Sequence, residues 1–112
     1  MPDLPPPQRG EVWLVSFDMA VGGEIQKTRP AVVLSNDTAN ALLNRVQLVP
    51  ISSQVERLYP AETYLSLNGE RRKAMADQIT TASKHRLQRL LGVLSKDDMI
   101  AVARIVRLQL DL

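Results

Sequence analysis

Short apolar blocks separated by turn-forming residues run along most of this chain, a pattern typical of a small β protein. Asn68-Gly69 predicts a tight turn between two of the strands. A helical turn from Lys84 and then a short strand to Leu94 are also expected, with Gly92 as a breaker. The main strands predicted from the blocks cover residues 9–18, 29–35, 45–52, 63–68 and 75–82.

Two helices are expected among these strands. Residues 38–44 are rich in alanine and leucine, and Asn36 or Asp37 can cap their N-terminus. A longer helix follows Ser95, which forms a capping-box pattern with Asp98. The apolar stripe of this helix, which should pack on the sheet or on a partner, contains Met99, Val102, Ala103, Val106 and Leu110.

The hydrophobic pattern also indicates the architecture. The first strand is apolar on both faces, with Trp13 and Val15 on one side and Val12 on the other. We therefore expect the core to cover one face and a second subunit the other. Pro50 predicts a bulge or a sheet edge near the end of the third strand. Five or six short strands with one terminal helix indicate a small, strongly bent sheet or barrel.

Composition narrows the classes of protein to consider. We place a single domain at residues 9–112, after a proline-rich arm at residues 1–8 that is expected to be disordered. The absence of cysteine excludes a disulfide framework, a thiolate zinc site and a cysteine nucleophile. No stretch resembles a membrane span or a signal peptide, so a cytoplasmic protein is expected. The net charge of +2 permits a polyanionic partner without requiring one.

The segment GGEIQKTRPAVVLSN, residues 22–36, carries the most prominent chemistry. Glu24, Lys27 and Arg29 follow a glycine pair and precede Pro30 and an apolar strand, so a charged loop is tied to a buried element. Arg29 can offer two fixed donors to a phosphate, and Glu24 beside cations can act as a base. The alternative is a hairpin turn with solvated charges, in which Arg29 and Glu24 form a surface salt bridge.

Other polar residues are weaker candidates. Ser52 and Ser53 stand at the end of the third strand, where a hydroxyl either binds a phosphate oxygen or satisfies backbone groups. Asp77 and Gln78 interrupt an apolar strand, so one of them should face inward or line a groove. His85 is the only histidine and is expected at the surface, which excludes a two-histidine ribonuclease mechanism within one chain.

Basic residues and missing motifs complete the candidate chemistry. The chain has no metal-ligand spacing, no Walker loop and no nucleophile elbow, so neither a metal nor a cofactor is expected. A nuclease of this sequence would have to act by positioning and electrostatic stabilisation. Six basic residues form either a basic rim that binds nucleic acid or an ordinary solvated face: Arg71, Arg72, Lys73, Lys84, Arg86 and Arg89.

Five segments of the chain, taken in order, resemble the MazF/PemK family of bacterial toxin endoribonucleases: RGEVWLVSFD, GGEIQKTRPAVVLSN, VPISSQ, ADQITTAS and RLQRLLGVLSKDDM. The most specific element is the run G-x-E-x-x-K-x-R-P-A-V-V-L-S. The resemblance implies an SH3-like β-barrel of five to seven strands, with a short internal helix and a C-terminal helix, that acts as a homodimer. It also implies sequence-specific, metal-independent cleavage of single-stranded RNA to a 2′,3′-cyclic phosphate and a 5′-hydroxyl, with the RNA 2′-OH as nucleophile.

The resemblance assigns roles to individual residues. Arg29 matches the family's catalytic arginine, which stabilises the charged phosphorane and protonates the leaving oxygen. Ser52 stands where the family usually has threonine, so it keeps the hydroxyl that binds the scissile phosphate but lacks the methyl that restricts the rotamer. Glu24 matches an acidic position near the scissile phosphate. The residues expected to bind RNA are Lys27, Thr28, Ser53 and Gln78.

The family also implies partners. An antitoxin with a disordered tail of acidic and apolar residues would fold onto the dimer and block the RNA groove, and operator DNA would be bound only through that complex. Two alternatives stay open. A related branch of the same fold poisons DNA gyrase, but it depends on a tryptophan-containing C-terminus, whereas the only tryptophan here is Trp13. A non-catalytic nucleic-acid-binding module would keep the basic rim without needing Arg29 and Ser52.

Overall fold

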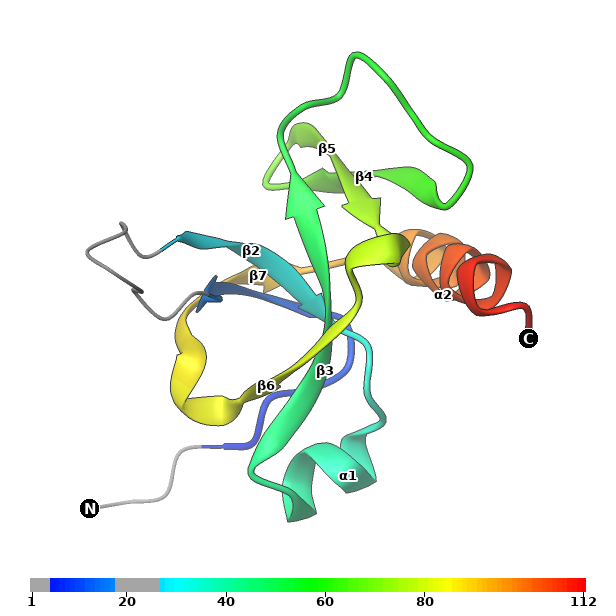
Figure 1. Cartoon of the computed structure of the whole chain (residues 1–112). Helices are drawn as coiled ribbons and strands as arrows, with labels where there is room; N and C mark the ends of the chain where they lie inside the picture. Colours follow the sequence, from blue (N-terminus) through cyan, green and yellow to red (C-terminus); the bar gives the residue numbers. More distant parts are fainter. Residues whose placement is uncertain (1–4, 18–26) are drawn as a thin grey trace, which may run out of the picture.

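The computed structural model describes residues 5–17 and 27–112 (Figure 1). The predicted site residue Glu24 and residues 1–4 of the proline arm lie outside this described part, whereas Pro7 is buried against the domain. In sequence order the elements are β1 (Glu11–Ser16), β2 (Thr28–Val33), α1 (Asp37–Leu42), β3 (Arg45–Ser52), β4 (Glu62–Leu67), β5 (Glu70–Met75), the 3₁₀ turn η1 (Ala76–Gln78), β6 (Thr80–Ser83), the 3₁₀ turn η2 (Lys84–Arg86), β7 (Leu87–Val93) and α2 (Lys96–Leu110).

The seven strands of the described chain form one antiparallel sheet in the order β4-β5-β3-β2-β1-β7, with β6 also paired to β3. The first half of β3 pairs with β6, whereas its last residues, Ile51 and Ser52, pair with β5. This change of neighbour lets β4 and β5 stand apart from the rest of the sheet, with α2 at the side (Figure 1). The ends of the sheet approach each other where the Asn68 amide donates a hydrogen bond to the Leu91 carbonyl (3.1 Å). The expected mainly β architecture is confirmed as a curled half-barrel with a short internal helix and a C-terminal helix.

Two hydrophobic clusters lie on opposite faces of β1. Val12 belongs to the cluster under α2, and Val15 belongs to a second cluster that Trp13 and Phe17 border. The chain's own side chains therefore contact both faces of β1, because successive side chains of a strand point to opposite sides. The predicted stripe of α2 is correct for Val102 and Val106, which are buried, but wrong for Leu110, which is 48% exposed. The fully buried Ile105 was missing from it.

The turns and caps that depend on local sequence are largely as expected. Asn68 and Gly69 both have positive φ angles, 53° and 80°, and connect β4 to β5 in a tight hairpin. The Asn36 side chain caps α1, and Ser95 Oγ caps α2 by accepting from the Asp98 N–H (3.1 Å). Asp98 does not complete a capping box, because its carboxylate accepts from the Ser66 N–H (3.0 Å) and so ties α2 to β4.

Pro50 lies inside β3 without interrupting it. It pairs with Ala31 of β2 in an unshifted register, so the predicted bulge is absent from this ladder. On its other side, β3 changes neighbour between Leu48, which pairs with β6, and Ile51, which pairs with β5. Pro50 lies between these two pairings, so on this side of β3 its missing N–H interrupts no ladder among the described strands. The predicted edge position is therefore correct for this side of β3 only.

The strand predicted over residues 75–82 is wrong. Strand β5 ends at Met75, the turn η1 follows, and β6 begins only at Thr80. A hydrogen bond from the Ile79 N–H to the Ala76 carbonyl (3.1 Å) closes the turn, since the chain must change direction to move along β3. Prediction missed β5 because its charged residues do not show the apolar pattern of a strand. Gly92, predicted as a breaker, lies within β7.

Candidate functional site

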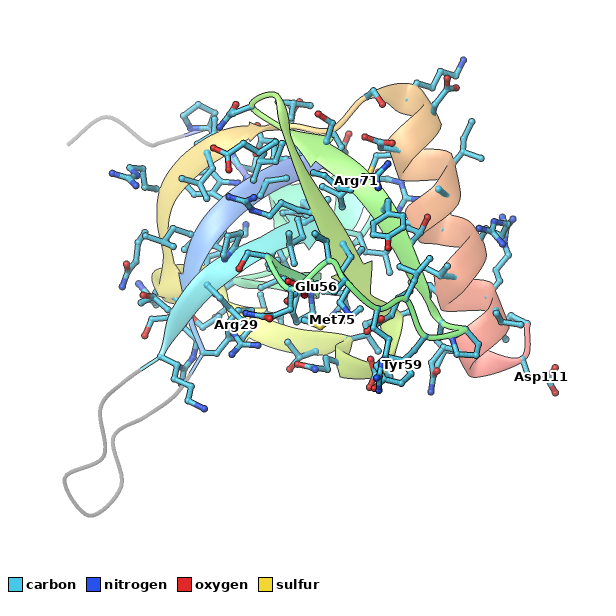
Figure 2. All side chains as sticks on the ribbon, turned by 90° about the horizontal axis from the view of Figure 1, so that it is seen from above. Arg29, Glu56, Tyr59, Arg71, Met75 and Asp111 are labelled. Atoms are coloured by element: carbon cyan, nitrogen blue, oxygen red, sulfur yellow. The ribbon has the colours of Figure 1, made fainter. Side chains whose placement is uncertain are left out.

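Arg29 lies at the start of β2, opposite Val15 of β1. The residue is half-buried. Figure 2 shows its position in the view from above. Because β2 and β3 are antiparallel, the start of β2 lies beside the end of β3, and this pairing brings Arg29 close to Ser52. The start of β2 and the end of β3, which are far apart in sequence, thus share one site.

Arg29 lines two adjacent pockets. The first, which we call the serine pocket, has a volume of about 450 Å³, and the second, the lysine pocket, about 340 Å³. The serine pocket is lined by Thr28, Arg29, Pro30, Ile51, Ser52, Ser53, Gln54 and Arg72. The lysine pocket is lined by Phe17, Lys27, Arg29, Pro50, Gln78 and Thr80.

The serine pocket combines two guanidinium groups with hydroxyl groups. Ser52 Oγ accepts a hydrogen bond from the Gln54 N–H (3.0 Å), which leaves its own proton free to donate to a ligand. The guanidinium of Arg72 donates to a Glu70 carboxylate oxygen (2.8 Å) in a pair at the surface. Guanidinium and hydroxyl donors that converge in one pocket suit a phosphate ester, whose oxygens accept several hydrogen bonds.

The lysine pocket extends the same surface. Lys27 is exposed and adds a second cation beside Arg29. Gln78 enters from the turn η1, and its side-chain amide makes a long contact of 3.7 Å to Met75 Sδ. An amide held this weakly can rotate and keeps both donor and acceptor capacity for a ligand.

The predicted site residues therefore gather around Arg29, with one exception that lies outside the described residues. Ser52, Ser53 and Thr28 share the serine pocket with it. The lysine pocket contains Lys27 and Gln78. The salt bridge between Arg29 and Glu24, considered from the sequence, involves a residue that the structure does not describe.

One prediction about polar residues holds in its second form, and another needs correction. Asp77 and Gln78 are both exposed, so neither faces inward, but Gln78 lines the lysine pocket, which is the groove position considered from the sequence. Asp77 lines a different pocket with Tyr59 and Glu62. Lys73 is not part of a basic rim, because its side chain is only 7% exposed and pairs with Glu62. His85 is exposed, as expected.

Arg72 is the main site residue that prediction did not single out. It appeared only as one member of the basic run, although it lies in the serine pocket. Successive side chains of a strand point to opposite faces, so Arg72 lies on one face of β5 and Arg71 and Lys73 lie on the other, but three adjacent cations concealed this alternation. Once β5 is recognised as a strand, this alternation separates Arg72 from its neighbours.

The described part of the chain shows neither a metal-binding cluster nor a membrane-spanning helix. In residues 5–17 and 27–112, no three His, Cys, Asp or Glu side chains gather in a way that could hold a metal ion. None of the helices in that part of the chain is long and apolar enough to cross a membrane.

Fold and site together define a small curled β half-barrel with a cationic, hydroxyl-lined pocket suited to a phosphate ester. Residues 8–110 match the family model described as PemK-like, MazF-like toxin of type II toxin-antitoxin system, and the chain belongs to this family. It is 37% identical to Endoribonuclease MazF9 of Mycobacterium tuberculosis, over 94% of this chain and 97% of that protein. The chain is therefore an endoribonuclease homologue, as the resemblance of its motifs indicated.

Solved structures share the fold. An endoribonuclease in complex with its cognate antitoxin, from a mycobacterial species, superposes with a TM-score of 0.79 at 23% identity, over 95% of this chain and 96% of that one. MazF from Deinococcus radiodurans gives a TM-score of 0.78 at 24% identity, over 96% and 98% of the two chains. At these identities the two structures support the architecture rather than the roles of single residues.

Proposed function

We propose that this chain is a cytoplasmic toxin endoribonuclease that cleaves single-stranded RNA at specific sequences without a metal ion. The observation that carries the proposal is the presence of Arg29 and Ser52, from two different strands, in one pocket. Donors positioned in advance around developing charge are a major source of catalytic power. A ribose 2′-hydroxyl supplies the nucleophile, so the protein has only to position and stabilise.

The reaction follows from this arrangement. The 2′-oxygen loses its proton to a base, bonds to the adjacent phosphorus, and expels the 5′-oxygen, which ends as a hydroxyl. The products are a 2′,3′-cyclic phosphate and a 5′-hydroxyl end. Arg29 neutralises the charge that develops on the phosphorane and gives a proton to the leaving oxygen, which it regains from water, and Ser52 donates to a non-bridging oxygen. Glu24 is the proposed base.

The pockets beside the scissile phosphate have separate tasks in this proposal. Thr28 and Ser53 contact the phosphate from the serine pocket. Lys27 and Gln78 bind the neighbouring nucleotide from the lysine pocket, which lies on the other side of Arg29. In such a divided site, charged groups hold the RNA backbone and an amide forms hydrogen bonds with the base. Phosphate contacts position the RNA, whereas base contacts determine which sequence is bound.

We extend the proposal to the partners of the chain. A homodimer would be blocked by a cognate antitoxin whose disordered acidic and apolar tail covers the cationic groove, and operator DNA would be bound only through that complex. Support comes from the antitoxin complex of the mycobacterial endoribonuclease and from the MazE-MazF complex of Deinococcus radiodurans, at 25% identity to this chain. Charge complementarity fits as well, because Lys27, Arg29 and Arg72 line the two pockets.

Cleavage of a long single-stranded RNA in excess EDTA tests the proposal. The wild-type protein should produce discrete fragments whose 5′-hydroxyl ends accept phosphate from polynucleotide kinase without prior dephosphorylation. Arg29→Ala should lower kcat/KM by about a hundred- to a thousandfold, the usual cost of losing one charge-stabilising donor. Arg45→Ala is the matched control, because Arg45 is exposed at the opposite end of β3 from Ser52. This variant should cleave RNA as fast as the wild type.

Each alternative gives a different result in the same series. RNA that stays intact at micromolar protein would refute endonuclease activity. Retention of uncut RNA that weakens with salt would indicate a non-catalytic binding module. Trapped complexes of gyrase with cleaved DNA, together with intact RNA, would indicate the gyrase-poisoning branch.

A further inference from the structure

The loop that joins β3 to β4, residues 53–61, leads directly out of the serine pocket. Ser53 and Gln54 line the pocket, and the rest of the loop extends toward Tyr59 (Figure 2). Val55 and Ala61 are its only partly buried residues, and the others are exposed. An exposed loop with so few apolar contacts has little to hold one conformation. Polar contacts must therefore determine where it lies.

A buried ion pair holds the loop from inside the domain. Lys73 Nζ lies 2.8 Å from Glu62 Oε1, and the two side chains are only 7% and 8% exposed. The same ammonium donates to the Arg57 carbonyl (2.8 Å), and the same carboxylate oxygen accepts from the Tyr59 backbone N–H (2.8 Å). Each member of the pair thus binds its partner and one backbone group of the loop.

Lys73 also connects the loop to the strand that carries Ser52. In the sheet it lies opposite Ser52 of β3 on one side and opposite Tyr64 of β4 on the other. The Tyr64 hydroxyl donates to the Val55 carbonyl (2.8 Å), and Ser52 Oγ accepts from the Gln54 N–H (3.0 Å). Four loop residues are therefore tied to this row of three residues and to Glu62.

Stability alone does not explain why this pair is charged. Burying two charges removes their hydration, and well-packed apolar residues of similar volume often serve a fold equally well. Apolar side chains would not bind the Arg57 carbonyl or the Tyr59 N–H. The distinct contribution of Lys73 and Glu62 is thus the conformation of the loop.

We propose that Lys73 and Glu62 are positioning residues for RNA cleavage, an inference that rests on the function proposed above. The pair holds the loop so that Ser53 and Gln54 face the scissile phosphate. It also fixes where the exposed loop side chains meet the nucleotides beside that phosphate, and so influences which sequences are cut. Neither residue touches the reacting atoms, and both act through the loop.

The double variant Lys73→Met/Glu62→Leu removes the contacts to the loop without leaving an unpaired buried charge. We expect its unfolding midpoint to stay near the wild-type value. Trypsin should cut after Arg57 at least about tenfold faster, because cleavage of a folded protein follows the population of open loop. Lys96→Met is the matched control, since it makes the same substitution at an exposed lysine in the first turn of α2.

Two kinetic readouts separate positioning from simple destabilisation. In the double variant, KM for a short single-stranded RNA should rise about tenfold, because the loop no longer holds its contacts in place. The relative cutting of different sites in a long RNA should change as well. Partial unfolding would lower only the concentration of active enzyme, so KM and the pattern of sites would stay as in the wild type.

The outcomes distinguish this inference from the function on which it rests. An active wild type together with a double variant of unchanged KM, cutting pattern and trypsin sensitivity would refute the positioning role alone. A wild type that leaves all RNA intact would refute the proposed function, and the positioning role with it. A double variant that unfolds in the assay buffer would also refute the inference, because the pair would then be required for the fold itself.

Discussion

Replacing Lys73 alone with methionine leaves the Glu62 carboxylate, which is 8% exposed, without the ammonium 2.8 Å away. Removing one partner of a buried ion pair typically costs about 3–5 kcal/mol, because the remaining charge stays buried without compensation. For a domain of this size 1 kcal/mol corresponds to about 4 °C in Tm, so we expect Tm to fall by about 12–20 °C. The double variant Lys73→Met/Glu62→Leu should lie within about 4 °C of the wild type, since no charge is left unpaired.

The surface pair between Arg72 and Glu70 provides the control. Its atoms are also 2.8 Å apart, but the side chains are 28% and 66% exposed. Glu70→Gln should therefore cost no more than about 1 kcal/mol. The assay is thermal unfolding followed by circular dichroism at one protein concentration, because self-association makes Tm depend on concentration. A Lys73→Met variant as stable as Glu70→Gln, or a double variant no more stable than Lys73→Met, would contradict the reasoning.

Three further substitutions test the hairpin and the serine pocket. Gly69→Ala should lower the free energy of unfolding in urea by about 1–2 kcal/mol, because the φ of +80° is costly for an L-residue although nothing lies within 4 Å of the added methyl. A Gly69→Ala variant whose free energy of unfolding equals that of the wild type, within the roughly 10–15% uncertainty of urea extrapolation, would contradict strain at this turn. Ser52→Thr should raise kcat/KM by up to about threefold, the gain from restricting one of three rotamers. Ser52→Ala should lower it by about tenfold, since one hydrogen bond to a charged group is lost, and an unchanged value would remove Ser52 from the site.

Local sequence determined the parts of this protein that depend on neighbouring residues. The bounds of β3, the caps at Asn36 and Ser95 and the hairpin turn at Asn68-Gly69 follow from periodicity, side-chain hydrogen bonding and the conformational freedom of glycine. The family was evident for the same reason, because its most specific motif is one continuous run that contains Arg29.

Only the tertiary structure decided how charged residues are used. The run of Arg71, Arg72 and Lys73 reads as a solvated cationic stretch, yet it folds into β5 because the preceding turn returns it along β4 and β3 accepts it on the other side. Pairing across three strands then buries Lys73 against Glu62 and places Arg72 in the serine pocket. Such placements depend on partners 11 or more residues away, since the Lys73–Glu62 contact spans 11 positions and Arg29 meets Ser52 only through antiparallel strands. Local propensity carries no information on contacts of that range. These contacts decide which side chains are buried, and burial sets the free energy of a charged group.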